Sequence, residues 1–355
     1  MKADRDLAPN PARNPGAGRM AAMRLILIAA VALGLAPGTW LRSPARLVDH
    51  QAPVIFTPLA LPQINAGEAA LLRGWRMTSA NEHFGGFSAL AAIDGQTLVS
   101  ASDRGRILHL SLGDPATPAA RMERLGDKAQ PDKRLTDVES MAFDPVSGTF
   151  WIGYEGVNAI ERLDRNFGAA QRVQPPQMRN WPANKGAEAM ARLNDGRFIV
   201  LAEGNPGWNW DEREFPGLLF PADPLGAREA LSFRFSAPPG YRPVDMVQIP
   251  DGRMVILLRK LHWQLPPRFS IKLVVADLDG IKPGGLWHGR QIAAIKPPLP
   301  SDNYEGLAMW PRADGSLNLW IISDDNGAAF QNTYLLQMRW DPRLDKPARP
   351  AGSGQ

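Results

Sequence analysis

Residues 137–156 read DVESMAFDPVSGTFWIGYEG, and this stretch has the pattern of one β-hairpin. An acidic opening leads into an apolar run, Ser147-Gly148 reverses the chain, and a second apolar run ends at Glu155. Turn residues that tolerate positive φ, placed between two apolar runs, are a strong hairpin signal. The stretch therefore predicts two antiparallel strands whose free ends lie together.

The same pattern occurs five times after residue 70. The other four copies turn at Asp94-Gly95, Asp195-Gly196, Asp251-Gly252 and Asp314-Gly315. Equivalent positions lie roughly 50 to 60 residues apart, which is enough for four strands in each unit. The repeat predicts an all-β fold, a β-propeller with five detected blades, and it leaves a sixth, more divergent blade open. Unrelated hairpins in a sandwich are the disfavoured alternative.

The last blade lacks a strand, because only residues 334–340 follow the fifth hairpin. We expect residues 70–77 to supply the missing strand and to close the ring, which removes an exposed edge. No long helical periodicity separates the apolar runs, which argues against a βαβ fold. Residues 51–342 are expected to form this single domain, followed by a disordered tail at 343–355. Outer strands are expected at 106–112, 121–125, 231–235 and 272–277.

Composition excludes several classes of protein. The 355 residues carry a formal net charge of +4 without any block of like charge, which is too mild to indicate nucleic-acid binding. The chain has no cysteine, so disulfides, thiolate zinc sites and a cysteine nucleophile are excluded. No G-x-S-x-G elbow, H-E-x-x-H motif or phosphate-binding loop occurs, and the five histidines show no ligand spacing.

Residues 1–50 are interpreted as a leader. Arg19 and Arg24 precede the apolar run 25–36, which is short for a membrane span and has the form of a signal peptide. The alternative is an uncleaved signal that tethers the protein to the inner membrane through residues 24–41. In both cases the expected location of the body is periplasmic or secreted.

The hairpin ends bring acidic residues to one face. In a propeller blade, the first and last residues of the innermost hairpin lie on the same side, so the repeat gathers them around one mouth of the central channel. Converging carboxylates repel unless they are protonated, paired with cations or bound to a metal ion. Oxygen ligands without cysteine favour Ca²⁺ or Mg²⁺. The expected metal ligands are Glu139, Glu188, Glu305, Asp103, Glu155, Glu203, Asp245 and Asp324.

Six strings of the sequence are distinctive: FGGFSAL, SDRG, DVESMAFD, KGAEAMA, DGRFIVLAEG and NYEGLAMW. They resemble the bacterial family called phytase-like, or esterase-like activity of phytase, over residues 70–340. The resemblance implies an exported β-propeller linked to phosphoester or ester hydrolysis. Through the alkaline β-propeller phytases, it also implies calcium in an acidic channel, with Glu139, Glu188 and Glu305 in that role. The chain departs from those phytases at Ser88, where the other repeats carry an acid, and in the fourth repeat, whose acid, Asp245, comes one place later. It also lacks their dense lysine and aspartate motifs.

Together these observations predict a metal-assisted hydrolase of a phosphate ester or other ester in the periplasm. Glu139, Glu188 and Glu305 are the expected catalytic residues, and the protein is expected to be a monomer with a small anionic ester as substrate. Two alternatives stay open: a non-catalytic propeller that binds a small ligand or a protein, and a lactone or sugar-ester hydrolase. The expected substrate-binding residues are Arg104, Lys185, Arg259 and Trp208.

Overall fold

The computed structural model describes residues 23–28, 51–62, 66–113, 118–125, 136–207, 212–227 and 229–344. Residues 23–28 are helical, and no helix among the described residues is long and apolar enough to cross a membrane. Chain contacts separate residues 1–44 from a second unit that starts at Ala45. Most of the predicted leader, and the predicted tail beyond residue 344, lie outside the described residues.

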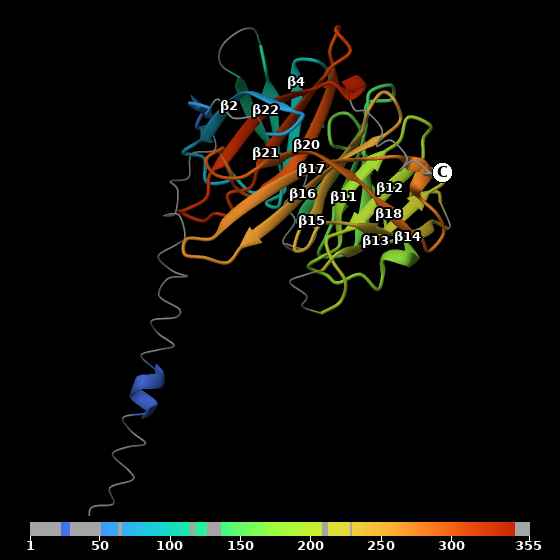
Figure 1. Cartoon of the computed structure of the whole chain (residues 1–355), viewed down its shortest axis with the longest axis horizontal. Helices are drawn as coiled ribbons and strands as arrows, with labels where there is room; N and C mark the ends of the chain where they lie inside the picture. Colours follow the sequence, from blue (N-terminus) through green and yellow to red (C-terminus); the bar gives the residue numbers. More distant parts are fainter. Residues whose placement is uncertain are drawn as a thin grey trace, which may run out of the picture. The chain divides into compact units, whose positions relative to one another are not determined.

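The described part of the second unit forms five β-sheets, here called blades 1 to 5 (Figure 1). Blade 1 contains β3 (Phe87–Ala92), β4 (Thr97–Ser102), β5 (Arg106–Ser111) and β6 (Ala119–Arg124). Blade 2 contains β7 (Val138–Asp144), β8 (Thr149–Tyr154), β9 (Ala159–Leu163) and β10 (Gln171–Val173). Blade 3 contains β11 (Ala187–Arg192), β12 (Phe198–Ala202), β13 (Glu214–Phe220), β14 (Leu231–Ser236) and β18 (Leu286–His288).

The remaining strands form two further blades. The described residues also include three short 3₁₀ helices, two in connections between strands and one after the last strand. Blade 4 contains β15 (Arg242–Gln248), β16 (Met254–His262), β17 (Arg268–Ala276) and β19 (Arg290–Ile295). Blade 5 contains β20 (Tyr304–Pro311), β21 (Leu317–Ser323), β22 (Thr333–Trp340), β2 (Ala70–Thr78) and β1 (Ile55–Pro58). The 3₁₀ helices are η2 (Pro176–Met178), η3 (Leu278–Gly280) and η4 (Pro342–Leu344).

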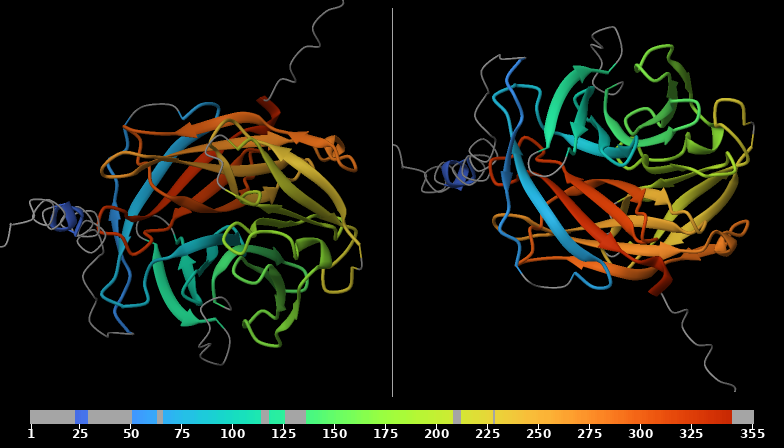
Figure 2. Two further views of the ribbon diagram at one scale, coloured as in Figure 1. Left: turned by 90° about the horizontal axis from the view of Figure 1, so that it is seen from below. Right: turned by 90° about the horizontal axis from the view of Figure 1, so that it is seen from above.

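The blades form a closed ring around a central channel. The innermost strands are β3, β7, β11, β15 and β20, and each contacts the innermost strand of the next blade, with β20 returning to β3. Figure 2 shows the blades following one another around this centre in chain order. Each gap between neighbouring blades is filled by its own apolar cluster, among the residues that are described. The propeller prediction is confirmed, and the blade number is five.

The ring closes within blade 5 as the sequence predicts. The strand expected at 70–77 is β2, which pairs antiparallel with β22 and lies beside it in Figure 1. β1 then adds to the outer side of β2, a strand that sequence reasoning missed. The blade therefore combines two strands from the start of the propeller with three from its end.

The outer edges of two blades are each covered by a segment of the chain that leads to a strand of the next blade. β18 leaves the connection between β17 and β19 of blade 4 and pairs in parallel with β14 of blade 3. The segment around Gly67 lies against β19, where Ala294 N–H donates to Ala66 C=O at 2.6 Å. Neither crossover was predicted, because a single short strand carries no periodic signal. Both protect unpaired backbone groups at a sheet edge.

A β-bulge interrupts the innermost strand of all five blades at the same position. In blade 2, Val138 pairs with Tyr154 and Ser140 with Gly153, so that Glu139 is the extra residue. A bulge leaves one residue without a ladder partner and redirects its side chain. The five bulged residues are Ser88, Glu139, Glu188, Val244 and Glu305.

Asp245 connects three blades from the centre of the ring. Its carboxylate accepts hydrogen bonds from the backbone N–H groups of Met246 at 2.8 Å and of Leu307 in blade 5 at 2.6 Å, and from the backbone of Leu90 in blade 1. The side chain is fully buried, and burial raises the pKa of Asp245 well above its usual value. A buried carboxylate that satisfies several N–H groups holds neighbouring strands in one register.

We expect Asp245→Ala to lower the free energy of unfolding by about 2 kcal/mol or more, because it leaves buried N–H groups without an acceptor. Asp245→Asn keeps one acceptor oxygen and should lower the free energy of unfolding by a smaller amount. Urea unfolding followed by circular dichroism measures both effects. An alanine variant as stable as the wild type would show that this carboxylate does not hold the blades together.

Candidate functional site

Two equivalent positions in each blade meet at one end of the channel. The first is the bulged residue of the innermost strand. The second is a residue at or near the end of the second strand that lies opposite the start of the innermost strand. In blade 5, for example, Asp324 N–H donates to Asn303 C=O at 2.9 Å. This second position is acidic in four blades and basic in blade 4: Asp103, Glu155, Glu203, Arg259 and Asp324.

Carboxylates at this end lie close enough to perturb one another, and we call eight of them the acidic mouth. Glu139 interacts with Asp103, Asp137, Glu155 and Glu305, and the remaining members are linked to these in the same way. The acidic mouth consists of Asp103, Asp137, Glu139, Glu155, Glu188, Glu203, Glu305 and Asp324. Seven of the eight predicted ligands are thus brought together.

Asp245, the eighth predicted ligand, does not join the acidic mouth. Its neighbours are the backbone N–H groups described above, and the bulged residue of blade 4 is Val244, which packs in an apolar cluster. A shift of one residue along a strand turns the side chain to the opposite side. The structure therefore corrects the ligand assignment of Asp245, whose geometry is that of a structural residue.

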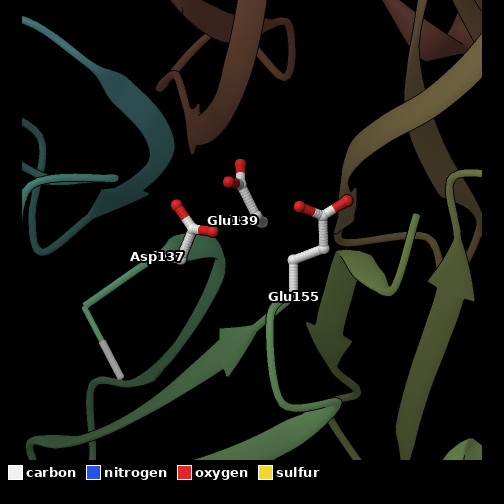
Figure 3. A group of neighbouring side chains, drawn as sticks. All are labelled: Asp137, Glu139 and Glu155. Atoms are coloured by element: carbon white, nitrogen blue, oxygen red, sulfur yellow. The ribbon is translucent and has the colours of Figure 1, made fainter. Parts of the chain in front are cut away.

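Three members of the acidic mouth form a compact group in blade 2. Asp137, Glu139 and Glu155 each offer a carboxylate oxygen, and the three oxygens lie within 4.8 Å of one another. Figure 3 shows the carboxylates pointing into a shared space. Asp137 immediately precedes β7, Glu139 is the bulged residue and Glu155 follows β8, so the hairpin geometry itself assembles the group. This group is the candidate metal centre.

Burial and mutual repulsion raise the pKa values of three glutamates at the acidic mouth. Burial, followed by the charges of Glu305 and Glu155, raises the pKa of Glu139 well above its usual value. Burial, followed by Glu139, raises the pKa of Glu188 in the same way. The pKa of Glu155 rises to about 7 through burial, although a hydrogen bond with Glu188 opposes the rise. Such shifts favour either protonation or the binding of a cation.

Arg259 balances the other side of the acidic mouth. Its guanidinium donates to Glu203 at 2.5 Å, to Asn303 Oδ1 at 2.7 Å and to Glu305. Asn303 also donates to Glu305, with its Nδ2 2.9 Å from Oε1. Burial raises the pKa of Glu305 to about 7, against the lowering effect of Arg259. Blade 4 thus supplies a fixed cation where the other blades supply an acid.

Two further cations lie at the edge of the acidic mouth. Arg242 Nη1 is 3.7 Å from Oε2 of Glu203 and 3.7 Å from Oε2 of Glu212. Arg104 Nε is 3.7 Å from Oδ1 of Asp103 and its Nη2 is 3.9 Å from Oδ1 of Asp325, and about a third of its side chain is exposed.

The other two predicted substrate contacts are placed differently. Lys185 Nζ donates to the backbone carbonyls of Asn205 at 3.2 Å and of Gly207, so that it supports the loop after β12. Trp208 lies outside the described residues.

The glycines of the FGGF string make room for two acids. Gly86 has a φ of 71°, and a Cβ at this position would lie 1.8 Å from Oδ1 of Asp103. Gly85 has a φ of 109°, and its Cβ would lie 2.6 Å from Oδ1 of Asp325. Only glycine combines this backbone conformation with so close an approach.

Sequence reasoning missed Asp137, Asn303 and Arg242 as members of the site or its immediate support. Each occupies the same place, at or just before the start of an innermost strand: Asp137 and Asn303 precede β7 and β20, and Arg242 opens β15. Each lies two positions before the bulged residue of its strand, and this spacing was the signal that could have found them.

The fold and the site together define a five-bladed β-propeller with a carboxylate cluster at one end of its channel. The family model described as "Phytase-like: Esterase-like activity of phytase" matches residues 82–327, and the chain belongs to this family. A comparison with curated proteins finds no match.

Solved structures with similar chain traces share little sequence with this protein. The PQQ-bound aldose sugar dehydrogenase of Streptomyces coelicolor is 12% identical, with 79% of this chain and 99% of that chain covered and a TM-score of 0.43. A luciferin-regenerating enzyme is 12% identical, with 84% and 91% covered and a TM-score of 0.41. Hydrazine synthase of Kuenenia stuttgartiensis is 13% identical, with 68% of this chain but 57% of that chain covered and a TM-score of 0.36. These similarities carry no argument about chemistry.

The acidic mouth predicts an unusual pH dependence of stability in the metal-free protein. Groups whose pKa is raised on folding, such as Glu155 and Glu305 at about 7, stabilise the fold below their unfolded pKa, and this stability is lost as the pH rises through about 7. We expect the melting temperature in EDTA to fall between pH 5 and pH 8. The lowered pKa of His262 acts in the opposite direction, but it is a single group.

Glu155→Gln removes one of these titrating groups, so its melting temperature should depend less on pH than that of the wild type. Differential scanning calorimetry at several pH values in EDTA makes the comparison. A wild-type melting temperature that rises steadily from pH 5 to pH 8 would contradict the raised pKa values.

Arg259 should be essential to the metal-free fold. Arg259→Gln leaves Glu203 and Glu305 without their shared cation, and removing one partner of a buried ion pair costs about 3–5 kcal/mol. Arg259→Lys keeps the charge but cannot bridge both acids with a planar fork, so we expect an intermediate loss. Urea unfolding in EDTA measures the series. Equal stability of all three proteins would show that Arg259 does not offset the repulsion.

Proposed function

We propose that the protein is a metal-assisted hydrolase of a phosphate ester or other ester, with its site at the acidic mouth. The observation that carries the proposal is the group of Asp137, Glu139 and Glu155, whose oxygens lie within 4.8 Å of one another. The membership in the phytase-like family supports a hydrolase. The proposal adds the substrate class, the metal and the roles of individual residues.

The geometry of the three carboxylates suits a divalent cation with oxygen ligands. Ca²⁺ binds oxygens at about 2.3–2.6 Å, so two oxygens on opposite sides of one ion are about 4.6–5.2 Å apart. Three oxygens within 4.8 Å of one another therefore fit one coordination sphere. Mg²⁺ has a shorter bond of about 2.0–2.1 Å and needs the group to contract slightly. We propose Ca²⁺ or Mg²⁺ as the ion.

The neighbouring residues divide the remaining tasks. A bound divalent ion would polarise the ester and lower the pKa of a coordinated water. Glu188 shares a hydrogen bond with Glu155, and we propose Glu188 as the group that exchanges a proton with the reacting group. Arg104 is the accessible cation beside the site and is our candidate contact for the substrate anion. Arg259 keeps Glu203 and Glu305 in place.

We also propose that the protein acts outside the cytoplasm, as a monomer on a small anionic ester. The support is the leader pattern of Arg24 and the apolar run that follows it. The non-catalytic propeller and the lactone or sugar-ester hydrolase are the alternatives that the experiment below separates from this proposal.

The metal centre predicts a cation-dependent gain in stability. An ion that binds only the folded protein, at about a hundred times its Kd, stabilises it by about 2.7 kcal/mol. We expect millimolar Ca²⁺ or Mg²⁺ to raise the melting temperature of the wild type above that in EDTA, and Glu139→Gln or Asp137→Asn to lose most of the increase. The same variants should lose metal-dependent hydrolysis in a screen of phosphomonoesters, phosphodiesters, carboxylic esters and lactones.

Glu214→Gln is the matched control. Glu214 is an exposed carboxylate on β13, the third strand of blade 3, and its side chain pairs with Arg234, so its neutralisation should leave the cation effect unchanged. If wild-type protein melts identically with and without the cations, the metal centre is refuted. Cation binding without hydrolysis of any ester class would instead favour a binding protein.

A further inference from the structure

A cavity separate from the acidic mouth lies on blade 1. Its volume is about 200 Å³, and no member of the acidic mouth lines it. The walls come from the outer strands β5 and β6 and from the segment before β3. The lining residues are Asn81, His83, Arg106, Met122, Glu123 and Arg124.

The register of the outer strands places two arginines side by side on this cavity. Arg106 of β5 lies directly opposite Arg124 of β6, and Leu108 lies opposite Met122. Because side chains alternate between the two faces of a sheet, Arg106, Arg124 and Met122 share one face. Like charges at directly opposed positions destabilise a sheet unless something compensates them.

The described residues compensate this repulsion only in part. Neither Arg106 nor Arg124 forms a side-chain hydrogen bond or ion pair with any residue in the described part of the chain, and the buried Nε of Arg106 has no acceptor there. Burial, followed by the charge of Arg124, lowers the pKa of Arg106, and the weaker attraction of Glu82 does not offset these effects. Two guanidinium groups thus lie on one face of the sheet with their mutual repulsion only partly offset.

The one acid in the cavity wall is already engaged on the other face of the sheet. Glu123 lies opposite Ile107, and its oxygens accept from His109 Nε2 at 2.6 Å and from Arg121 Nη1 at 2.8 Å. Burial tends to raise the pKa of Glu123, but these hydrogen bonds outweigh it and hold the value below its usual range. Glu123 is therefore not the counter-ion of Arg106 and Arg124.

We propose that this cavity binds a phosphate group between Arg106 and Arg124. A phosphate carries about 1.5 to 2 negative charges near neutral pH, which matches two guanidinium groups better than a single carboxylate does. Arginine binds phosphate oxygens through paired N–H groups, and a ligand oxygen would supply the acceptor that the Arg106 Nε lacks. Met122 on the same face offers apolar contact to the organic part of a phosphate ester. The site does not depend on the proposed metal centre.

The test is isothermal titration calorimetry at constant ionic strength in EDTA, so that no metal-bound phosphate contributes. The probes are inorganic phosphate and phenyl phosphate, with sulfate as the comparison anion. We expect Arg106→Gln and Arg124→Gln each to weaken phosphate binding at least tenfold. Arg197→Gln, which removes an exposed arginine paired with Asp195 at a hairpin turn, should bind as the wild type does. Glu139→Gln should also bind normally, which separates this site from the acidic mouth.

Thermal melting controls for misfolding. Without phosphate, Arg124→Gln should melt no lower than the wild type, because the substitution removes a repulsion; phosphate should then raise the melting temperature of the wild type alone. If phenyl phosphate binds more tightly than inorganic phosphate, the ligand of the site is a phosphate ester. If it binds equally or more weakly, the ligand is the free phosphate ion. No phosphate binding by the wild type, or equal binding by both arginine variants, would overturn the proposal.

Discussion

The acidic mouth depends on one irregularity of backbone pairing, the bulge at the start of each innermost strand. In an unbroken ladder, successive side chains of the innermost strand would point alternately into the apolar clusters on its two sides. An unpaired glutamate buried in such a cluster would be strongly destabilising. The extra residue escapes this alternation, and in blades 2, 3 and 5 it is a glutamate. Serine fills the position in blade 1, where Ser88 Oγ donates to Val138 C=O at 2.7 Å, and valine fills it in blade 4. The same bulge thus presents a candidate ligand in three blades and a structural residue in two.

Two kinds of buried carboxylate result, and they differ in what surrounds them. Asp245 faces backbone N–H groups and has no acidic neighbour, so its charge is satisfied by the strands that it joins. Glu139 and Glu188 face other carboxylates, and Arg259 on the opposite side offsets only part of that repulsion. A site that is electrostatically unfavourable in isolation is a frequent mark of function, because a ligand of opposite charge relieves it. This contrast separates the structural acid from the candidate ligands.

Sequence alone predicted most of this architecture, since repeated turns and apolar runs are local signals. The strand at 70–77 followed from counting strands in blade 5, and the meeting of Glu139, Glu188 and Glu305 followed from the hairpin topology. Asp245 was misassigned because the bulge, which puts Val244 rather than Asp245 at the position equivalent to Glu139, leaves no trace in composition. Asp137 was missed because it lies outside the apolar run. The ion pairs of Arg259 join residues that are distant in the sequence. The positions of Arg106 and Arg124 opposite each other depend on the register of two outer strands. No short sequence motif encodes either arrangement.

The way in which β2 pairs with β22 also determines when the molecule can be completed. β2 is synthesised before any blade is finished, yet its partner emerges more than 250 residues later. During that interval β2 can pair only with β1, which precedes it in the chain, and blades 1 to 4 can only form an open arc. Pairing across so long a separation is slow, so the final step of folding is the docking of the two ends of the propeller. The strand that holds the native ring closed is therefore the one that waits longest for its second partner while the protein is made.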